Sequence, residues 1–127
     1  MRRAAEGGEV RAMANLALLE LEAGHGDEAL AWSRRATTGA PMLAHARRTH
    51  GKVALTLGHV DEALAAFNAA LAIEPNATNR FNVAVALLKR GRAAEAIPLL
   101  EECVRDPQLS EPARSLLVQA RRLIEGP

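Results

Sequence analysis

The sequence predicts an all-α fold, an α-solenoid of three antiparallel helix-turn-helix repeats followed by a C-terminal capping helix. The first observation is an internal repeat, because the stretch GHGDEAL at 24–30 returns as GHVDEAL at 58–64. The second is that glycines recur at nearly constant intervals, at Gly24, Gly58 and Gly91. The third is that no segment alternates apolar and polar residues as a strand would. A period near 34 residues without strand patterns is typical of stacked helix pairs.

Each repeat has a first helix that ends at one of these glycines and a second helix that begins just after it. A glycine directly past a helix end can adopt the left-handed conformation that closes the last turn. Acidic residues follow, and they lie in the first turn of the second helix, where the helix dipole favours negative charge. These residues are Asp27, Glu28, Asp61, Glu62 and Glu95.

Prolines mark the other end of each second helix. Pro41, Pro75 and Pro107 follow the apolar pattern at similar intervals, and proline cannot continue a helix. Pro98 lies inside the sixth predicted helix and is expected to bend it or loosen its first turn. The patterns together predict helices at about 8–23, 26–38, 42–57, 60–73, 77–90, 93–105 and 111–124.

Small residues recur where the two helices of a pair would face each other. A single pair cannot bury its apolar side, so neighbouring pairs must stack, and about three repeats are needed for stability. The small residues are Ala17, Gly51 and Ala84 on the first helices and Ala29, Ala63 and Ala96 on the second helices.

The pattern resembles the tetratricopeptide repeat family over about residues 9–110. The second repeat carries the family's positions most fully, with Gly51, Ala63, Phe67, Ala70 and Pro75. The resemblance implies one domain over 1–127, with repeats at about 10–43, 44–76 and 77–110 and a capping helix at about 111–124.

Composition restricts the function classes. Sixteen basic and 15 acidic residues give a net charge of +1, whereas proteins that bind nucleic acid usually carry a strong basic excess. We therefore expect no nucleic-acid partner. No apolar stretch reaches the roughly 18 residues that a membrane span needs, so a cytoplasmic location is expected. Whether the chain is a piece of a longer protein stays open.

Histidine and cysteine spacings do not indicate a metal site, a cofactor or an enzyme. His45 and His50 are five residues apart on one helix, which turns them to different faces. Cys103 has no His or Cys near it in sequence and is expected to be a packed thiol. His50 occupies a position that should face the partner helix, so we favour a buried ring that makes a hydrogen bond; its role stays open.

In the family, the first helices line a concave groove that holds a peptide, and the resemblance carries this role to matching positions. His45, Arg48 and Lys52 have the spacing of one helix face. A row of cations beside apolar side chains suits an acidic peptide that also carries apolar residues. The candidate groove residues are Arg11, Leu18, His45, Arg48, Lys52, Phe81, Val85 and Lys89, with Ala14, Leu21, Leu55 and Thr78 on the same stripe.

The resemblance thus implies a non-catalytic module that binds a protein or peptide. The family's clamp for a chaperone's terminal carboxylate is not expected, because its positions hold Ala14, Leu18, Thr49, Thr78 and Asn82. A second interpretation is a scaffold that assembles into homo-oligomers through an apolar edge, with Met13 and Leu19. A third is an RNA-binding helical repeat, which the near-neutral charge and the scarcity of aromatic residues disfavour.

Overall fold

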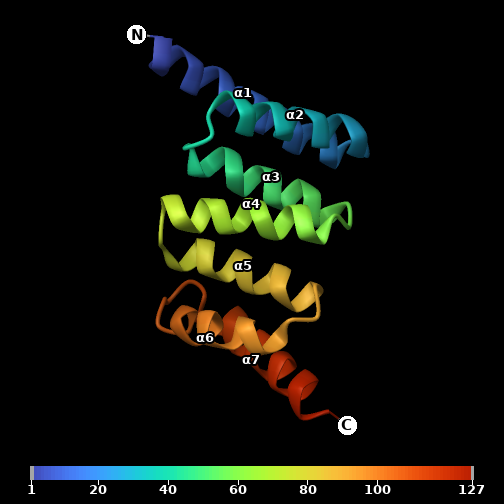
Figure 1. The fold of residues 1–127 in the computed structure, drawn as a ribbon, viewed down its shortest axis with the longest axis vertical. Helices are drawn as coiled ribbons and strands as arrows, with labels where there is room; N and C mark the ends of the chain where they lie inside the picture. The colour runs from blue at the N-terminus through green and yellow to red at the C-terminus, as the bar shows by residue number, and fades with distance from the viewer. Residues whose placement is uncertain (1, 127) are drawn as a thin grey trace. The chain divides into compact units, whose positions relative to one another are not determined.

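The computed structural model describes residues 2–126, with side chains from residue 8 onward. Within this range it contains seven α-helices and no strand (Figure 1). The helices are α1 (Arg2–Glu22), α2 (Gly26–Gly39), α3 (Ala44–Thr56), α4 (Val60–Ile73), α5 (Ala77–Lys89), α6 (Ala93–Cys103) and α7 (Ser110–Glu125).

The predicted helices agree with these bounds within a few residues, except at the start of α1. This helix begins at Arg2, not near residue 8 as predicted. The stretch RRAAE is rich in strong helix formers, and these let the helix continue through two glycines that the prediction had placed outside it. Helix α6 runs through Pro98 as a single helix.

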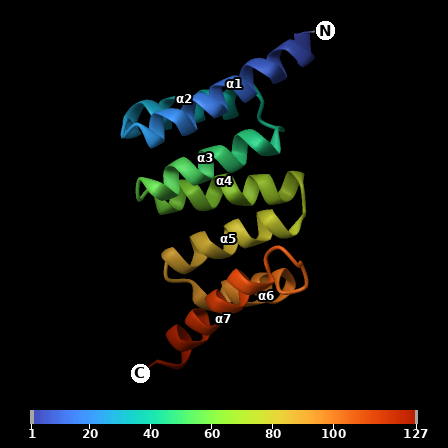
Figure 2. The ribbon, with the colours of Figure 1, turned by 180° about the vertical axis from the view of Figure 1, so that it is seen from behind.

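The helices form two compact units, one ending at Ile73 and the other beginning at Glu74. In unit 1, α1 packs against α2, α3 packs against α4, and both α1 and α2 contact α3. In unit 2, α6 packs against both α5 and α7. The antiparallel hairpins α1–α2 and α3–α4 can be followed from both sides (Figures 1 and 2). A single domain over 1–127, divided into the three repeats named above, stays a prediction.

The helix-ending glycines adopt the predicted conformation. Gly24, Gly58 and Gly91 have φ of 85°, 85° and 84°. At each, the N–H of the next residue donates to the carbonyl five positions back, which satisfies a carbonyl that the helix end leaves open. These bonds join His25 to Glu20, His59 to Ala54 and Arg92 to Leu87, each at 2.8 Å. The acidic residues also lie in the first turns of α2, α4 and α6, as predicted.

The small residues lie at the helix contacts, as predicted. Ala17, Ala29 and Ala63 are fully buried in unit 1, and Ala84 and Ala96 are fully buried in unit 2. This burial agrees with their expected place between packed helices.

Gly51 shows most directly why one of these positions must be small. A Cβ at Gly51 would lie 2.8 Å from Cζ of Phe67 and closer still to two other ring atoms. Phe67 is only 2% exposed, so its ring cannot turn away into solvent. The ring of α4 therefore occupies the space that a side chain on α3 would need.

Candidate functional site

Helices α1 and α3 bring four basic residues together on one face of unit 1. The pKa of His45 is lowered, first by partial burial and then by the positive charges of Arg11, Arg48 and Lys52. Arg11 and Lys52 are exposed, whereas His45 and Arg48 are half-buried. We call these four residues the cationic face. Leu18, which was predicted to lie on the same face, is half-buried on α1.

Two side chains of α1 differ from the expectation. Ala14 is fully buried in a cluster with Val10, Ala36 and Ala46, so it cannot line a groove. Met13, expected on an exposed edge, packs against that same cluster. Both residues lie where α1 meets α2 and α3. The family stripe had treated Ala14 as open, and the self-assembly interpretation had treated Met13 as exposed.

In unit 2, two of the predicted groove residues line a hollow between α5 and α7. Val85 and Lys89 lie there beside Leu88 of α5, and Phe81, half-buried on the same helix, lies outside the lining. Sequence analysis missed the other side of this hollow, because α7 was interpreted only as a capping helix. The α7 residues in the lining are Leu116, Gln119 and Leu123.

The predicted groove residues are therefore divided between the two units. Arg11, Leu18, His45, Arg48 and Lys52 belong to unit 1, whereas the remaining three belong to α5 of unit 2. Each surface is described within its own unit, and one continuous groove across all three repeats stays a prediction.

His50 has a defined partner, as favoured from the sequence. Its Nε2 lies 2.5 Å from Oε2 of Glu62, and Arg34 donates to both oxygens of that carboxylate at 2.9 and 2.8 Å. The hydrogen bonds from Arg34, followed by those from His50, lower the pKa of Glu62 to about 2 against the opposing effect of burial. Since an ionised carboxylate only accepts, Nε2 of His50 must carry the donated proton.

This network joins three helices of unit 1. Arg34 comes from α2, His50 from α3 and Glu62 from the first turn of α4. Nδ1 of His50 is buried and makes no hydrogen bond to the described residues. The contact between Arg34 and Glu62 spans 28 positions, so spacing within one helix could not reveal it. The network links the hairpin α1–α2 to the hairpin α3–α4, so its role is structural.

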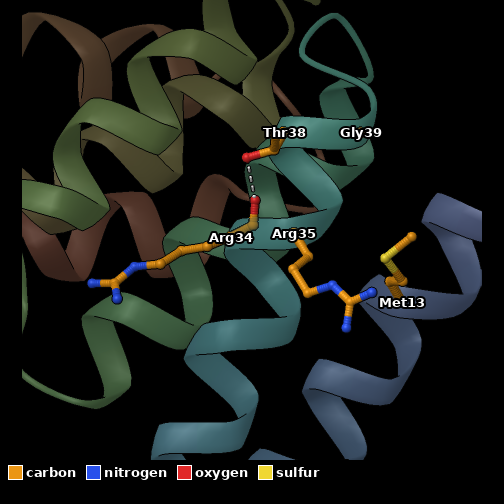
Figure 3. A pocket seen from close by; sticks show the side chains of 5 residues that line it. All are labelled: Met13, Arg34, Arg35, Thr38 and Gly39. Atoms are coloured by element: carbon orange, nitrogen blue, oxygen red, sulfur yellow. Dashed lines mark hydrogen bonds between the residues drawn. The ribbon is translucent and has the colours of Figure 1, made fainter.

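A shallow depression between α1 and α2 is lined by Met13, Arg34, Arg35, Thr38 and Gly39 (Figure 3). The Arg34 side chain points away from Met13 toward its Glu62 partner, while the Arg35 side chain extends toward Met13. The Arg35 guanidinium also lies 4.7 Å from the ring centroid of Trp32. Both guanidinium groups thus have partners within the protein, and nothing further marks the depression as a binding site.

Cys103 is the packed thiol expected from the sequence. It is fully buried, and its Sγ–H donates to the Ala77 carbonyl at 3.4 Å. Burial raises the pKa of this thiol, which keeps it in the unreactive neutral form. Among the described residues, no three His, Cys, Asp or Glu side chains come close enough to hold a metal ion. None of the helices in residues 2–126 combines the length and hydropathy that crossing a membrane requires.

Comparison with protein families supports the resemblance seen in the sequence. Residues 48–110 match the model of the tetratricopeptide repeat, a segment that contains most of the α3–α4 hairpin and all of the α5–α6 hairpin. The chain belongs to the tetratricopeptide repeat family. None of the curated protein sequences compared with the chain matches it.

Solved tetratricopeptide repeat structures share the fold at low sequence identity. The first TPR of Spaghetti (RPAP3), bound to an HSP90 peptide, aligns with a TM-score of 0.86 at 13% identity, covering 94% of this chain and 96% of that one. The Yersinia enterocolitica type III secretion chaperone SycD, in complex with a peptide of the translocator YopD, aligns with a TM-score of 0.78 at 17% identity, covering 90% and 93%.

MamA from Desulfovibrio magneticus RS-1 aligns with a TM-score of 0.81 at 23% identity over 91% of this chain. The chain spans only 66% of the MamA chain, slightly less than two thirds of its length. Together with the helix hairpins described above, these similarities confirm the predicted fold class, an all-α solenoid.

Proposed function

We propose that the chain is a non-catalytic interaction module that binds an acidic segment of another protein on its cationic face. The convergence of Arg11, Arg48 and Lys52 around the half-buried ring of His45 supports this proposal most directly. Like charges that are held together repel one another, and carboxylates from a ligand would relieve that repulsion. Leu18, half-buried on α1, would contact apolar side chains of the same ligand.

The helices suit such binding because they are ordered before the ligand arrives. Arg11 and Lys52 project from two helices that pack against each other, α1 and α3. Only the ligand then loses much conformational entropy on docking. Exposed cations act mainly on the association rate and lose effect as salt rises. Affinity should therefore fall with increasing ionic strength.

Two of the structural neighbours carry peptides, which supports a peptide ligand for this chain as well. One is the Spaghetti domain with its HSP90 peptide, and the other is SycD with its YopD peptide. Their identities to the chain are low, so they support the kind of ligand and not its sequence.

A charge reversal tests the proposal. Arg11→Glu combined with Lys52→Glu changes two exposed residues, one on each helix of the cationic face. A peptide array of varied charge would first select ligands, and fluorescence polarisation would then measure their affinities. We expect acidic, apolar peptides to be selected and the double variant to bind them about tenfold or more weakly.

A matched control separates local charge from net charge. Arg105→Glu with Arg114→Glu makes the same charge change on exposed residues of unit 2 and should leave the affinity unchanged. Selection of peptides regardless of charge, or equal affinity in the Arg11/Lys52 variant, would contradict the proposal. Light scattering over a concentration series would reveal self-assembly into homo-oligomers, and an RNA titration would reveal RNA binding. A cytoplasmic location stays a prediction.

A further inference from the structure

The hollow between α5 and α7 in unit 2 combines aliphatic side chains with one charge. Val85, Leu88, Leu116 and Leu123 form its apolar lining, and Lys89 and Gln119 are its polar members. Its volume is about 240 Å³. This is smaller than the roughly 300–1,000 Å³ of pockets that hold drug-sized ligands. A space of this size suits one or two side chains and not a cofactor.

We propose that this hollow binds an aliphatic side chain of a protein segment, with an adjacent acidic side chain of that segment paired to Lys89. The inference deepens the proposed function, because it assumes that the chain binds protein segments. It adds a second contact site, on helices that sequence analysis did not combine, and it specifies the ligand residue at that site.

Exposure of the lining supports an aliphatic ligand. Leu123 is 65% exposed, whereas Leu117 and Ala120 of the same helix are buried. Leu116 and Leu123 are seven positions apart, so both lie on the face toward α5. A ligand side chain in the hollow would remove apolar surface from water, which favours binding.

The polar members specify what should accompany that side chain. Lys89 is exposed in the last turn of α5 and is the only charged residue of the lining, so the charge complementary to the site is negative. The exposed Gln119 carries both donors and an acceptor, which suits the backbone of an extended peptide. An acidic residue beside leucine or isoleucine therefore fits both parts of the hollow.

The probe is a blocked tripeptide of glutamate, leucine and glutamate, acetylated at its N-terminus and amidated at its C-terminus. Blocked ends leave the side chains as the only source of carboxylate. Two matched peptides carry serine in place of leucine or glutamine in place of both glutamates. Binding is followed by amide chemical shifts of the isotope-labelled full chain at millimolar peptide.

The protein variants are chosen to keep the fold. Leu123→Asp places a negative charge at an exposed position of the hollow, beside Lys89. Val118→Asp is the control, because Val118 is 49% exposed on the same helix but lies outside the lining. We expect the probe to shift signals of α5 and α7, Leu123→Asp to weaken binding about tenfold or more, and Val118→Asp to leave it unchanged.

The outcomes separate this inference from the proposed function. Unchanged affinity in Leu123→Asp, no preference over the serine or glutamine peptide, or no shifts in α5 and α7 would overturn the inference. If the probe still shifts α5 and α7 in the Arg11→Glu/Lys52→Glu variant, the hollow binds independently of the cationic face. If the cationic face binds array peptides but Leu123→Asp has no effect, only the inference fails.

Discussion

The hairpins α3–α4 and α5–α6 share a framework but fill it differently. Seven positions before the helix-ending glycine, α3 has Gly51 and α5 has Ala84. Nine positions after that glycine, α4 has Phe67 and α6 has Leu100. Gly51 has no side chain, and the side chains of Ala84, Phe67 and Leu100 are buried. The larger filler on the second helix thus accompanies the smaller residue on the first.

The hairpin α1–α2 departs from this pattern, because it has Ala17 and the small, fully buried Ser33 at the equivalent positions. The buried Ser33 hydroxyl donates to the Leu30 carbonyl, so its polarity is satisfied within α2. Interiors are packed at near-crystalline density, so side-chain volume at one position limits what its neighbour can hold. In the α3–α4 and α5–α6 hairpins the two positions therefore fill one shared space with different residues, which we call the shared-space rule.

The hairpins also differ at the fourth position after the glycine, where each has a glutamate. Glu62 of α4 accepts hydrogen bonds from Arg34 and His50 on two other helices. Glu95 of α6 forms an ion pair with Arg92, which is only three positions away in the sequence. The same first-turn glutamate can thus be a link between helices in one repeat and a local pair in another.

Removing the aromatic ring should have the largest effect. We expect Phe67→Ala to cost about 3–5 kcal/mol of unfolding free energy, because Gly51 has no side chain that could fill the cavity. Urea denaturation at equilibrium measures this. A loss below about 1 kcal/mol would mean that the ring contributes little to the hairpin.

A methyl group at Gly51 should be the next most damaging change. Gly51→Ala places Cβ within 2.8 Å of three atoms of the Phe67 ring and should cost about 1–3 kcal/mol, despite the better helix propensity of alanine. Adding Phe67→Leu recreates the alanine and leucine of the third hairpin and should recover much of that loss. Equal stability losses with and without Phe67→Leu, measured in a double-mutant cycle, would contradict the shared-space rule.

Acid should weaken unit 1 through Glu62. Its pKa of about 2 lies below the ordinary value, so its stabilisation is complete above about pH 5 and is lost as pH falls toward 2. Allowing for partial exposure, we expect about 1–2 kcal/mol. Glu62→Gln should be less stable at pH 7 and should reduce the stability difference between pH 7 and pH 3. Glu95→Gln is the matched control, and an equal effect there would contradict the assignment.

The smallest predicted effect concerns the two histidines of α3, which have opposite surroundings. His50 contacts the carboxylate of Glu62, whereas His45 is near Arg11, Arg48 and Lys52. Lys52→Gln should raise the pKa of His45, because it removes one of the charges that lower it. An NMR titration of the ring protons measures this. An acidic ligand should raise the same pKa, so its affinity should increase as pH falls through neutrality toward 5.

Local features of the fold could be predicted, whereas contacts between distant segments could not. The glycines, the acidic first turns and the small residues such as Ala63 act within one turn or recur with the period, so one sequence reveals them. The link from Arg34 to Glu62 depends on how unit 1 places the side chains of α2 and α4 next to each other. The same holds for the place of Leu123 beside α5, since helical spacing says nothing about which neighbour a face meets.

The protein also contains a natural reporter in each unit. Trp32 is its single tryptophan and lies on α2, and Cys103 is its single cysteine and lies on α6. Fluorescence follows the environment of the indole, while a thiol reagent reaches the buried sulfur only after α6 separates from α5. The two signals, recorded on one unmodified sample, would show whether unit 1 and unit 2 unfold together or one after the other.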